Sequence, residues 1–297
     1  MTKKHALTPA TWARDKRQIY KWVVPYLGSK PIASIETPDL LAVLKRIEAK
    51  GVIDTAHRSR EVCGRVFRYA IATGRAKHDI AADLVGALAP RTTTHHAAII
   101  DPVKVGELLR AIEGYDGQPT TAAALRIAPY VFVRPTELRA AEWSEMTLEG
   151  EQPEWRIPAK RMKMPRRIVP LSRQAVGILR KLVDITGRQQ YVFPAIGGGG
   201  RPISENTLNG ALRRIGYSGD EMTAHGFRTM ASTLLNEQGV HPDLIELQLA
   251  HAERNTVRAA YNRAQRLAER RVMMQSWADH LDGLKRYAMA NSEETHK

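Results

Sequence analysis

Cysteine is nearly absent from the sequence, since Cys63 is the only one among 297 residues. No disulfide bond can therefore form within the chain, and no metal site built from several cysteines can exist. Cys63 lies at helical spacing with Val66 and Phe67, which indicates a buried apolar position rather than a nucleophile. No apolar run approaches the ~18 residues of a membrane span, and no signal-peptide core follows Met1. We expect a cytoplasmic protein in a reducing compartment, with no membrane partner.

The motifs of the common hydrolases and nucleotide-dependent enzymes are also missing. The sequence contains no HExxH, GxSxG, SxxK or paired CxxC pattern. The stretch 216–220 comes close to a GxSxG turn, but Asp220 occupies the final glycine position. The glycine run 197–200 is followed by Arg201 and Pro202, where a phosphate-binding loop requires Gly-Lys-Ser/Thr. These absences argue against metallohydrolase, serine hydrolase and ATP-dependent chemistry, and we expect no metal and no cofactor.

Positive charge, by contrast, is abundant. Lysine and arginine number 45 against 31 aspartates and glutamates, which gives a net charge of +14. With 43% hydrophobic and 26% charged residues, the composition is that of a folded protein and not of a disordered tail. An excess of this size favours a polyanionic partner, of which nucleic acid is the commonest. A protein that is merely basic remains the alternative.

The first third of the chain has the pattern of a helical bundle. Thr8-Pro9 and Thr37-Pro38 each offer an N-cap followed by a first-turn proline. Two further helices are expected, over 55–73 and near 79–88. One face of the longer helix is basic and carries four arginines: Arg58, Arg60, Arg65 and Arg68.

Residues 90–96 show no periodicity and predict a linker between two domains, 1–95 and 96–297. The second domain is expected to be mainly helical, although Pro129 and Pro135 interrupt one helical stretch over 120–143. Two strand-like pieces, 155–158 and 168–171, flank a basic segment. The predicted fold class is therefore mainly α, with a helical bundle followed by a mainly helical domain that holds a small antiparallel sheet. The later helices are expected near 172–187, 204–215, 226–239, 242–250 and 256–284.

The second domain also carries scattered residues suited to phosphate chemistry. Arg134 precedes a first-turn proline and lies three residues before Glu137, so that a carboxylate could orient a guanidinium whose fork suits a phosphate. His225 and Arg228 have the same spacing and could together hold an anion and manage a proton. Taken alone, the first pair is more typical of an ordinary surface ion pair, and the second is a weak pattern that a capped helix start also explains.

The other candidates are a histidine, a tyrosine and a lysine. His251 precedes Tyr261 by ten residues, and a tyrosine phenol with its reference pKa near 10 attacks poorly unless cations stabilise the phenolate. Lys163 lies in the basic segment between the two strand-like pieces and could protonate a leaving hydroxyl. Packing of Tyr261 on a helix face is the ordinary alternative for that residue. The remaining cations of this segment could simply contact phosphates: Lys160, Arg161, Arg166 and Arg167.

The order of these elements resembles that of the tyrosine recombinase (phage integrase) family. Arg-x-x-Glu, a hairpin lysine, His-x-x-Arg, Leu-Ala-His and then a tyrosine follow one another along the chain. The resemblance covers most of the sequence and is similar to the branch found in prophages and genomic islands. The segments that carry it are 22–35, 132–143, 155–171, 222–237 and 245–281, with the ending Met273–Asp279.

The resemblance implies a role for each matching residue. Tyr261 would attack a DNA phosphodiester and form a 3′-phosphotyrosyl link, without metal or ATP. Arg134 and Arg228 would bind the non-bridging oxygens, and Lys163 would be the general acid for the leaving 5′-oxygen. His225 would assist proton transfer at the tyrosine, His251 would hydrogen-bond the phosphate, and Glu137 would brace the cations.

Two features depart from the family pattern. Members of this branch often carry an additional N-terminal domain that binds arm sites, whereas this sequence begins almost directly at the helical core-binding bundle. The segment 163–168 also lacks the histidine expected before Ile-Val-Pro-Leu, and a shifted register would make Lys160 the general acid in place of Lys163.

The expected protein is therefore a site-specific recombinase acting on double-stranded DNA at attachment sites. The first domain would lie on one face of the DNA and bind it through Arg58, Arg60, Arg65 and Arg68. It would assemble as a homotetramer on DNA, with accessory DNA-bending proteins as further candidate partners. A type IB topoisomerase and a catalytically decayed DNA-binding module are the alternatives.

Overall fold

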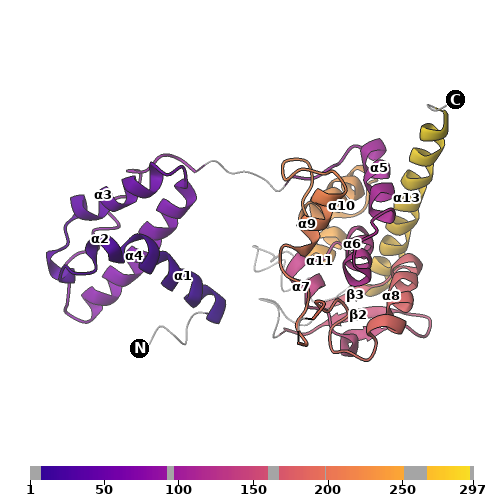
Figure 1. Cartoon of the computed structure of the whole chain (residues 1–297), viewed down its shortest axis with the longest axis horizontal. Coiled ribbons are helices and arrows are strands. Elements are labelled where there is room, and N and C mark those ends of the chain that lie inside the picture. The colour runs from indigo at the N-terminus through magenta and orange to yellow at the C-terminus, as the bar shows by residue number, and fades with distance from the viewer. Residues whose placement is uncertain (1–7, 92–96, 160–166, 198, 251–265, 295–297) are drawn as a thin grey trace. The chain divides into compact units, whose positions relative to one another are not determined.

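The computed structural model of the protein describes residues 8–91, 97–159, 167–197, 199–250 and 266–294. The chain divides into two compact units, Met1–Thr94 and His95–Lys297. Figure 1 shows both units. Both are mainly helical and the second holds a small antiparallel sheet, which confirms the predicted fold class. None of the helices in the described ranges is both long and apolar enough to cross a bilayer.

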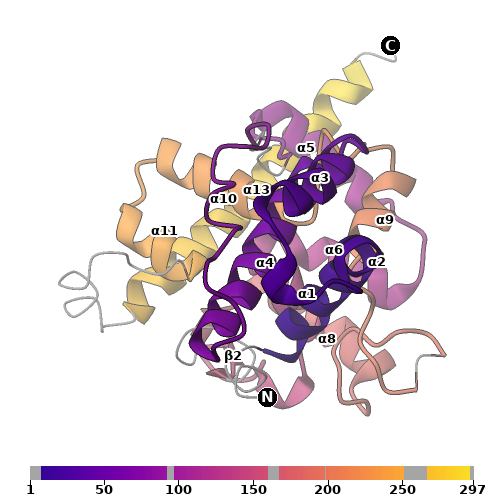
Figure 2. The same cartoon turned by 90° about the vertical axis from the view of Figure 1, so that its left-hand side faces the viewer.

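The first unit is built around α4. Thr8 caps α1 by accepting a hydrogen bond from the Thr11 amide at 3.3 Å, as its Thr-Pro start predicted. Both α1 and α3 pack against α4 (Figure 2), and their apolar faces enclose a core that includes Leu40, Leu44 and Phe67. The helical segments of this unit are α1 (Pro9–Trp22), α2 (Val24–Leu27), η1 (Ile32–Ser34), α3 (Thr37–Glu48) and α4 (Ile53–Ala72).

The short helix predicted near 79–88 is wrong. This segment forms successive turns in which the amides of Ala82 and Val85 donate to carbonyls three residues earlier. Asp79 accepts from the Ala81 amide at 3.1 Å, a local bond that competes with helix formation, and Gly86 has a φ of +85°. Ile80, Ala81, Leu84 and Leu88 still pack into the core, whereas Val85 is exposed, so the pattern predicted most of the burial and not the backbone.

The second unit encloses the larger core. Its elements are α5 (Pro102–Glu113), α6 (Pro119–Val131), α7 (Pro135–Arg139), η2 (Trp143–Glu145), β1 (Met146–Thr147), β2 (Glu154–Ile157), β3 (Arg167–Pro170), α8 (Arg173–Thr186), α9 (Thr207–Arg214), α10 (Gly226–Glu237), α11 (Pro242–Leu249) and α13 (Leu267–Glu294). The three strands pair antiparallel in the order β1-β2-β3, with Trp155 opposite Val169. The sequence predicted β2 and β3 but not the two-residue β1.

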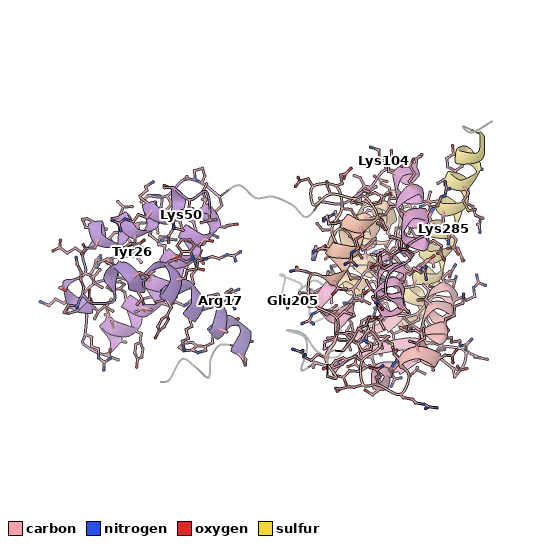
Figure 3. All side chains as sticks on the ribbon, in the orientation of Figure 1. Arg17, Tyr26, Lys50, Lys104, Glu205 and Lys285 are labelled. Atoms are coloured by element: carbon pink, nitrogen blue, oxygen red, sulfur yellow. The ribbon has the colours of Figure 1, made fainter. Side chains whose placement is uncertain are left out.

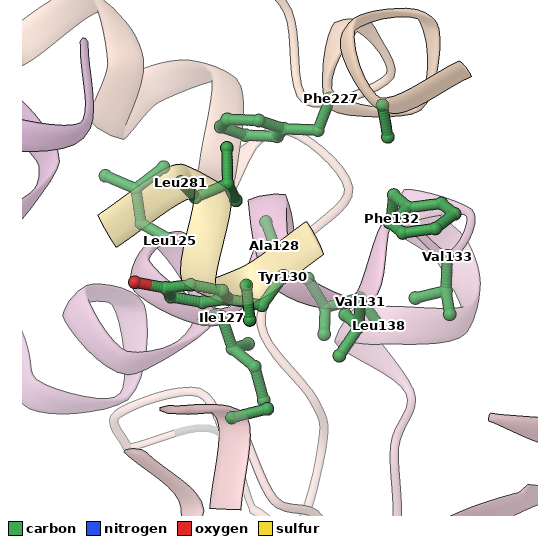
Figure 4. Close-up of a cluster of buried hydrophobic side chains, with 14 of the residues drawn as sticks. Leu125, Ile127, Ala128, Tyr130, Val131, Phe132, Val133, Leu138, Phe227 and Leu281 are labelled. Carbon is green, nitrogen blue, oxygen red and sulfur yellow. The ribbon is translucent and has the colours of Figure 1, made fainter. Parts of the chain in front are cut away.

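The end of α6 is the point around which this unit is organised. Pro129 does not interrupt the helix, contrary to the prediction, and α6 continues to Val131 before Phe132 turns the chain in the left-handed region with a φ of 34°. Trp277 of α13 donates its indole N–H to the Pro129 carbonyl at 2.9 Å. Figure 4 shows this end of α6 among buried side chains from other elements, including Leu138, Phe227 and Leu281. The residues that follow Phe132 therefore start from a fixed backbone.

Candidate active site at the end of α6

Arg134 and Glu137 form the ion pair that their spacing predicted. Arg134 is the N-cap residue of α7, and its backbone amide donates to Glu137 Oε2 at 3.0 Å. Its Nη1 donates to Glu137 Oε1 at 2.9 Å. The Arg134 side chain is 37% exposed, whereas that of Glu137 is 5% exposed. The carboxylate is therefore buried beneath a guanidinium that still faces solvent.

Arg167, the first residue of β3, shares the same carboxylate. Its Nη1 donates to Glu137 Oε2 at 3.0 Å, and its side chain is 4% exposed. Burial lowers the pKa of Arg167 to about 9, with Arg228, Arg270 and Arg134 adding to the fall while Glu137 opposes it. The side chain thus remains charged at neutral pH. Arg167, which we expected to contact phosphates, is buried against Glu137 in the structure.

Arg228, in the first turn of α10, binds the ends of two helices. Its Nη1 donates to the Phe132 carbonyl at 3.0 Å after α6, and its Nη2 donates to the Leu249 carbonyl at 2.7 Å at the end of α11. Helix C-termini carry partial negative charge and favour cations. Burial, together with the charge of Arg134, lowers the pKa of Arg228 to about 10.

The end of α11 brings Arg134 and Arg228 together. Arg134 Nη2 donates to the carbonyl of Ala250 at 2.9 Å, next to the Leu249 carbonyl that Arg228 binds. Ala250 adopts a left-handed φ of 49°, which ends the helix there. Two consecutive carbonyls therefore hold one guanidinium each. His225 is the N-cap residue of α10, three positions before Arg228, and is half-buried.

Several predicted site residues lie outside the described ranges. They are Lys160, Arg161, Lys163, Arg166, His251 and Tyr261. Strands β2 and β3 pair as the two arms that flank the first four of these residues in the sequence.

The arginines of α4 are mostly bound within the first unit. Arg65 donates to Asp15 of α1, Arg68 donates to Asp79 at 2.8 Å, and Arg60 donates to the Ala81 carbonyl at 3.2 Å. Arg58 is exposed and has no hydrogen bond or ion pair to another described residue. Other cations, such as Arg17 and Lys50, project from the surface of the first unit (Figure 3).

Sequence reasoning missed Arg270 and Gln248. Arg270 of α13 is 2% exposed, and its Nη2 donates to the Ile168 carbonyl at 2.7 Å and to Gln248 Oε1. Gln248 of α11 is fully buried. Arg270 stands three, four and seven residues before Met273, Met274 and Trp277, so an arginine in line with a buried apolar stripe was the available signal.

The assembled site has more positive than negative charge. Around Arg167, the charges of Arg134, Arg228 and Arg270 are opposed chiefly by Glu137. Within the described ranges, no group of three histidines, cysteines or acidic residues is placed to hold a metal ion. Buried cations fixed by carbonyls, beside the half-exposed Arg134, form a site suited to a phosphate group.

Family comparisons agree with this arrangement. Residues 1–87 match the phage integrase central domain and residues 99–267 match the phage integrase family. The integrase of Enterobacteria phage P4 is 39% identical over 292 residues, which cover 91% of this chain and 66% of that protein. The chain thus spans about two thirds of the length of this relative.

Two solved structures share the fold. Lambda integrase (residues 75–356), bound as a dimer to a core site, has a TM-score of 0.67 at 19% identity, covering 85% of this chain and 91% of that one. A lambda integrase tetramer bound to a Holliday junction has a TM-score of 0.66 at 18% identity, covering 86% and 75%. With both halves of the sequence matched and a relative at 39% identity, the chain belongs to the phage integrase family.

Proposed function

We propose that the protein is a site-specific DNA recombinase that cuts and rejoins double-stranded DNA at attachment sites through a tyrosine nucleophile. Membership of the phage integrase family supports this function. The observation that carries it is the pairing of Arg134 and Arg228 on the adjacent carbonyls of Ala250 and Leu249. Two guanidiniums fixed side by side can bind the two non-bridging oxygens of one phosphodiester.

Each chemical step has a residue of the required type. The Tyr261 oxygen attacks phosphorus, the bond to the 5′-oxygen breaks, and a 3′-phosphotyrosyl diester forms. His225 assists removal of the tyrosine proton, and Lys163 gives a proton to the 5′-oxygen, with Lys160 as the alternative donor. Attack by another 5′-hydroxyl reverses these steps on a new strand. The diester count is unchanged, so no external energy source is needed.

The remaining site residues bind the DNA phosphates or hold the arginines in position. His251 directly follows Ala250, whose carbonyl holds Arg134, and this adjacency supports a hydrogen bond from His251 to the same phosphate. Glu137 orients Arg134 and neutralises part of the charge of Arg167. The cations of 160–166 and exposed arginines such as Arg58 bind the DNA backbone, which makes affinity fall as salt rises.

The two units have different functions, DNA binding and catalysis. Residues 1–95 act as the core-type DNA-binding domain and residues 96–297 as the catalytic domain. Strand exchange requires four active sites on two duplexes, and the tetrameric lambda integrase on a Holliday junction supports a homotetramer on DNA. The protein works where bacterial DNA lies, in the cytoplasm on the nucleoid, and accessory DNA-bending proteins can assist assembly.

A nicked suicide duplex tests this function. The duplex carries the directly repeated sequence that borders the prophage or genomic island encoding the protein. A nick beside the scissile phosphate blocks religation. The wild-type protein should form a covalent protein–DNA adduct that resists denaturation. Tyr261→Phe should abolish the adduct and leave DNA affinity nearly unchanged, because it removes one hydroxyl.

The same assay separates the alternative functions. A wild-type protein that shifts the duplex but forms no adduct would be a decayed DNA-binding module. An adduct that still forms with Tyr261→Phe would support the cleavage activity and show only that Tyr261 is not the nucleophile. Relaxation of a supercoiled plasmid that lacks the repeat, without recombinant products, would indicate a type IB topoisomerase.

A further inference from the structure

The chain enters the second unit beside the turn that carries His225. Ala97 is the first described residue after 92–96, and its carbonyl accepts hydrogen bonds from the Thr223 amide at 3.2 Å and the Thr223 hydroxyl at 3.3 Å. Ile99, two residues later, packs against the main core. The entering segment is therefore fixed to Thr223, two positions before His225.

Thr223 also holds the start of α10. Its hydroxyl accepts a hydrogen bond from the Gly226 amide at 3.1 Å, and its carbonyl accepts from the same amide at 2.9 Å. A single hydroxyl group thus links the Ala97 carbonyl to the first residue of the helix that bears Arg228.

Glycine is needed at position 226 because the backbone of the entering segment lies so close to it. A Cβ atom at this position would lie 2.3 Å from the Ala97 carbonyl oxygen and 3.2 Å from the Ala98 Cα. Both are backbone atoms and cannot be moved by a side-chain rotation. Any larger residue would push the entering segment and the start of α10 apart.

The other sides of this turn are fixed to α9. Asn209 Oδ1 accepts a hydrogen bond from the Ala224 amide at 2.9 Å, and Arg213 Nη2 donates to the Met222 carbonyl at 2.9 Å. Ala97 holds the turn from the chain segment that enters the second unit. The Arg228 guanidinium, three residues after His225, must reach the Phe132 and Leu249 carbonyls from this start.

We propose that Thr223 and Gly226 are positioning residues, which use the chain segment at Ala97 to set the place of His225 and Arg228 for DNA cleavage. Neither residue is assigned to phosphate or proton chemistry, and both act through α10. The role rests on the proposed recombinase function. It makes Ala97, near the start of the second unit, part of the support of the candidate active site.

Thr223→Val provides the first test, because valine keeps the shape and loses the hydroxyl. With the full chain and the nicked duplex at saturating protein, the single-turnover rate of adduct formation should fall about tenfold, because the hydroxyl's bonds to the Ala97 carbonyl and the Gly226 amide are both lost. The dissociation constant for the duplex should not change. Thr223→Ser, which restores the hydroxyl, should recover the wild-type rate.

Thr186→Val is the matched control for stability. The Thr186 hydroxyl is buried and donates to the Val192 carbonyl at 3.0 Å, outside the contacts of the candidate site. It should lower the melting temperature about as much as Thr223→Val without slowing adduct formation. Equal slowing by both valine variants would mean a general loss of stability and would overturn the positioning role.

Gly226→Ala and Gly177→Ala form a second matched pair. Gly177 lies in α8 with nothing within 4 Å of an added Cβ. Gly226→Ala should slow adduct formation more than Thr223→Val does, whereas Gly177→Ala should match the wild type. A wild-type rate in both Thr223→Val and Gly226→Ala would overturn the inference. Absence of any adduct in the wild-type protein would instead overturn the proposed function.

Discussion

The arginines of α4 and those of the candidate site carry the same charge in opposite surroundings. Arg68 is 59% exposed and pairs with its own partner, Asp79. Arg167 is 4% exposed, and it shares Glu137 with Arg134 while lying within reach of the charges of Arg228 and Arg270. The first arrangement is balanced and solvated. The second is buried and has too few carboxylates.

This difference shows what the net charge of the chain can and cannot reveal. A solvated, paired arginine costs the fold little and adds to the general attraction for a polyanion. A buried cluster of like charges is costly to the fold unless carbonyl groups and a carboxylate offset the charges, and a bound anion would stabilise it further. We propose that placement separates the cations that attract DNA from those that bind one phosphate.

Removal of the shared carboxylate should have the largest effect on stability. Glu137→Gln keeps the shape of the side chain but leaves Arg167 buried among other guanidiniums without its counter-charge. Breaking a buried ion pair by removing one partner costs about 3–5 kcal/mol, and we expect a loss of that size in the free energy of unfolding. Urea denaturation measures it. A loss below ~1 kcal/mol would mean that Arg167 does not depend on Glu137.

Arg134→Ala should chiefly affect cleavage. Arg134 is the guanidinium of the cluster that faces solvent, and its removal takes a preorganised charge away from the phosphate during reaction. The rate of adduct formation on the nicked duplex should fall on the order of 10²-fold or more.

The control for this variant is Arg139→Ala, at the other end of α7. Arg139 donates to the Ile203 carbonyl at 2.9 Å and is not among the contacts of the site. It should cleave at the wild-type rate. Equal rates for Arg134→Ala and the wild type would remove Arg134 from the active site.

Local features of the fold could be predicted from the sequence. Thr8-Pro9 starts a helix as predicted, because a cap and a fixed proline φ act within one turn. At Thr37-Pro38 a helix also starts, but its N-cap is Glu36 and not Thr37, which is the first helical residue. The Arg134–Glu137 pair follows from the same kind of short spacing. Residues 79–88 were mispredicted because the Asp79 side chain offers the backbone a competing bond that an apolar pattern does not record.

Long-range features could not be predicted in this way. Arg166 and Arg167 are indistinguishable in the sequence, and only the pairing of β3 with β2 buries Arg167 against Glu137. Arg270 and Gln248 meet because α11 and α13 pack together, and a single unaligned chain does not encode that contact in a local pattern. The carbonyls that hold Arg228 also belong to two other helices.

The smallest effect is expected at the exposed pair of the first unit. Arg68→Ala removes a guanidinium that is 59% exposed and donates to Asp79 at 2.8 Å. Exposed ion pairs contribute about 0.2–1 kcal/mol, so the free energy of unfolding should change by no more than that, and the cleavage rate at saturating protein should stay at the wild-type value. Urea denaturation beside the Glu137→Gln variant measures the contrast directly. If Arg68→Ala were as destabilising as Glu137→Gln, solvent exposure would not distinguish the two groups of arginines. The division into cations that attract the DNA backbone and cations that bind one phosphate would then fail.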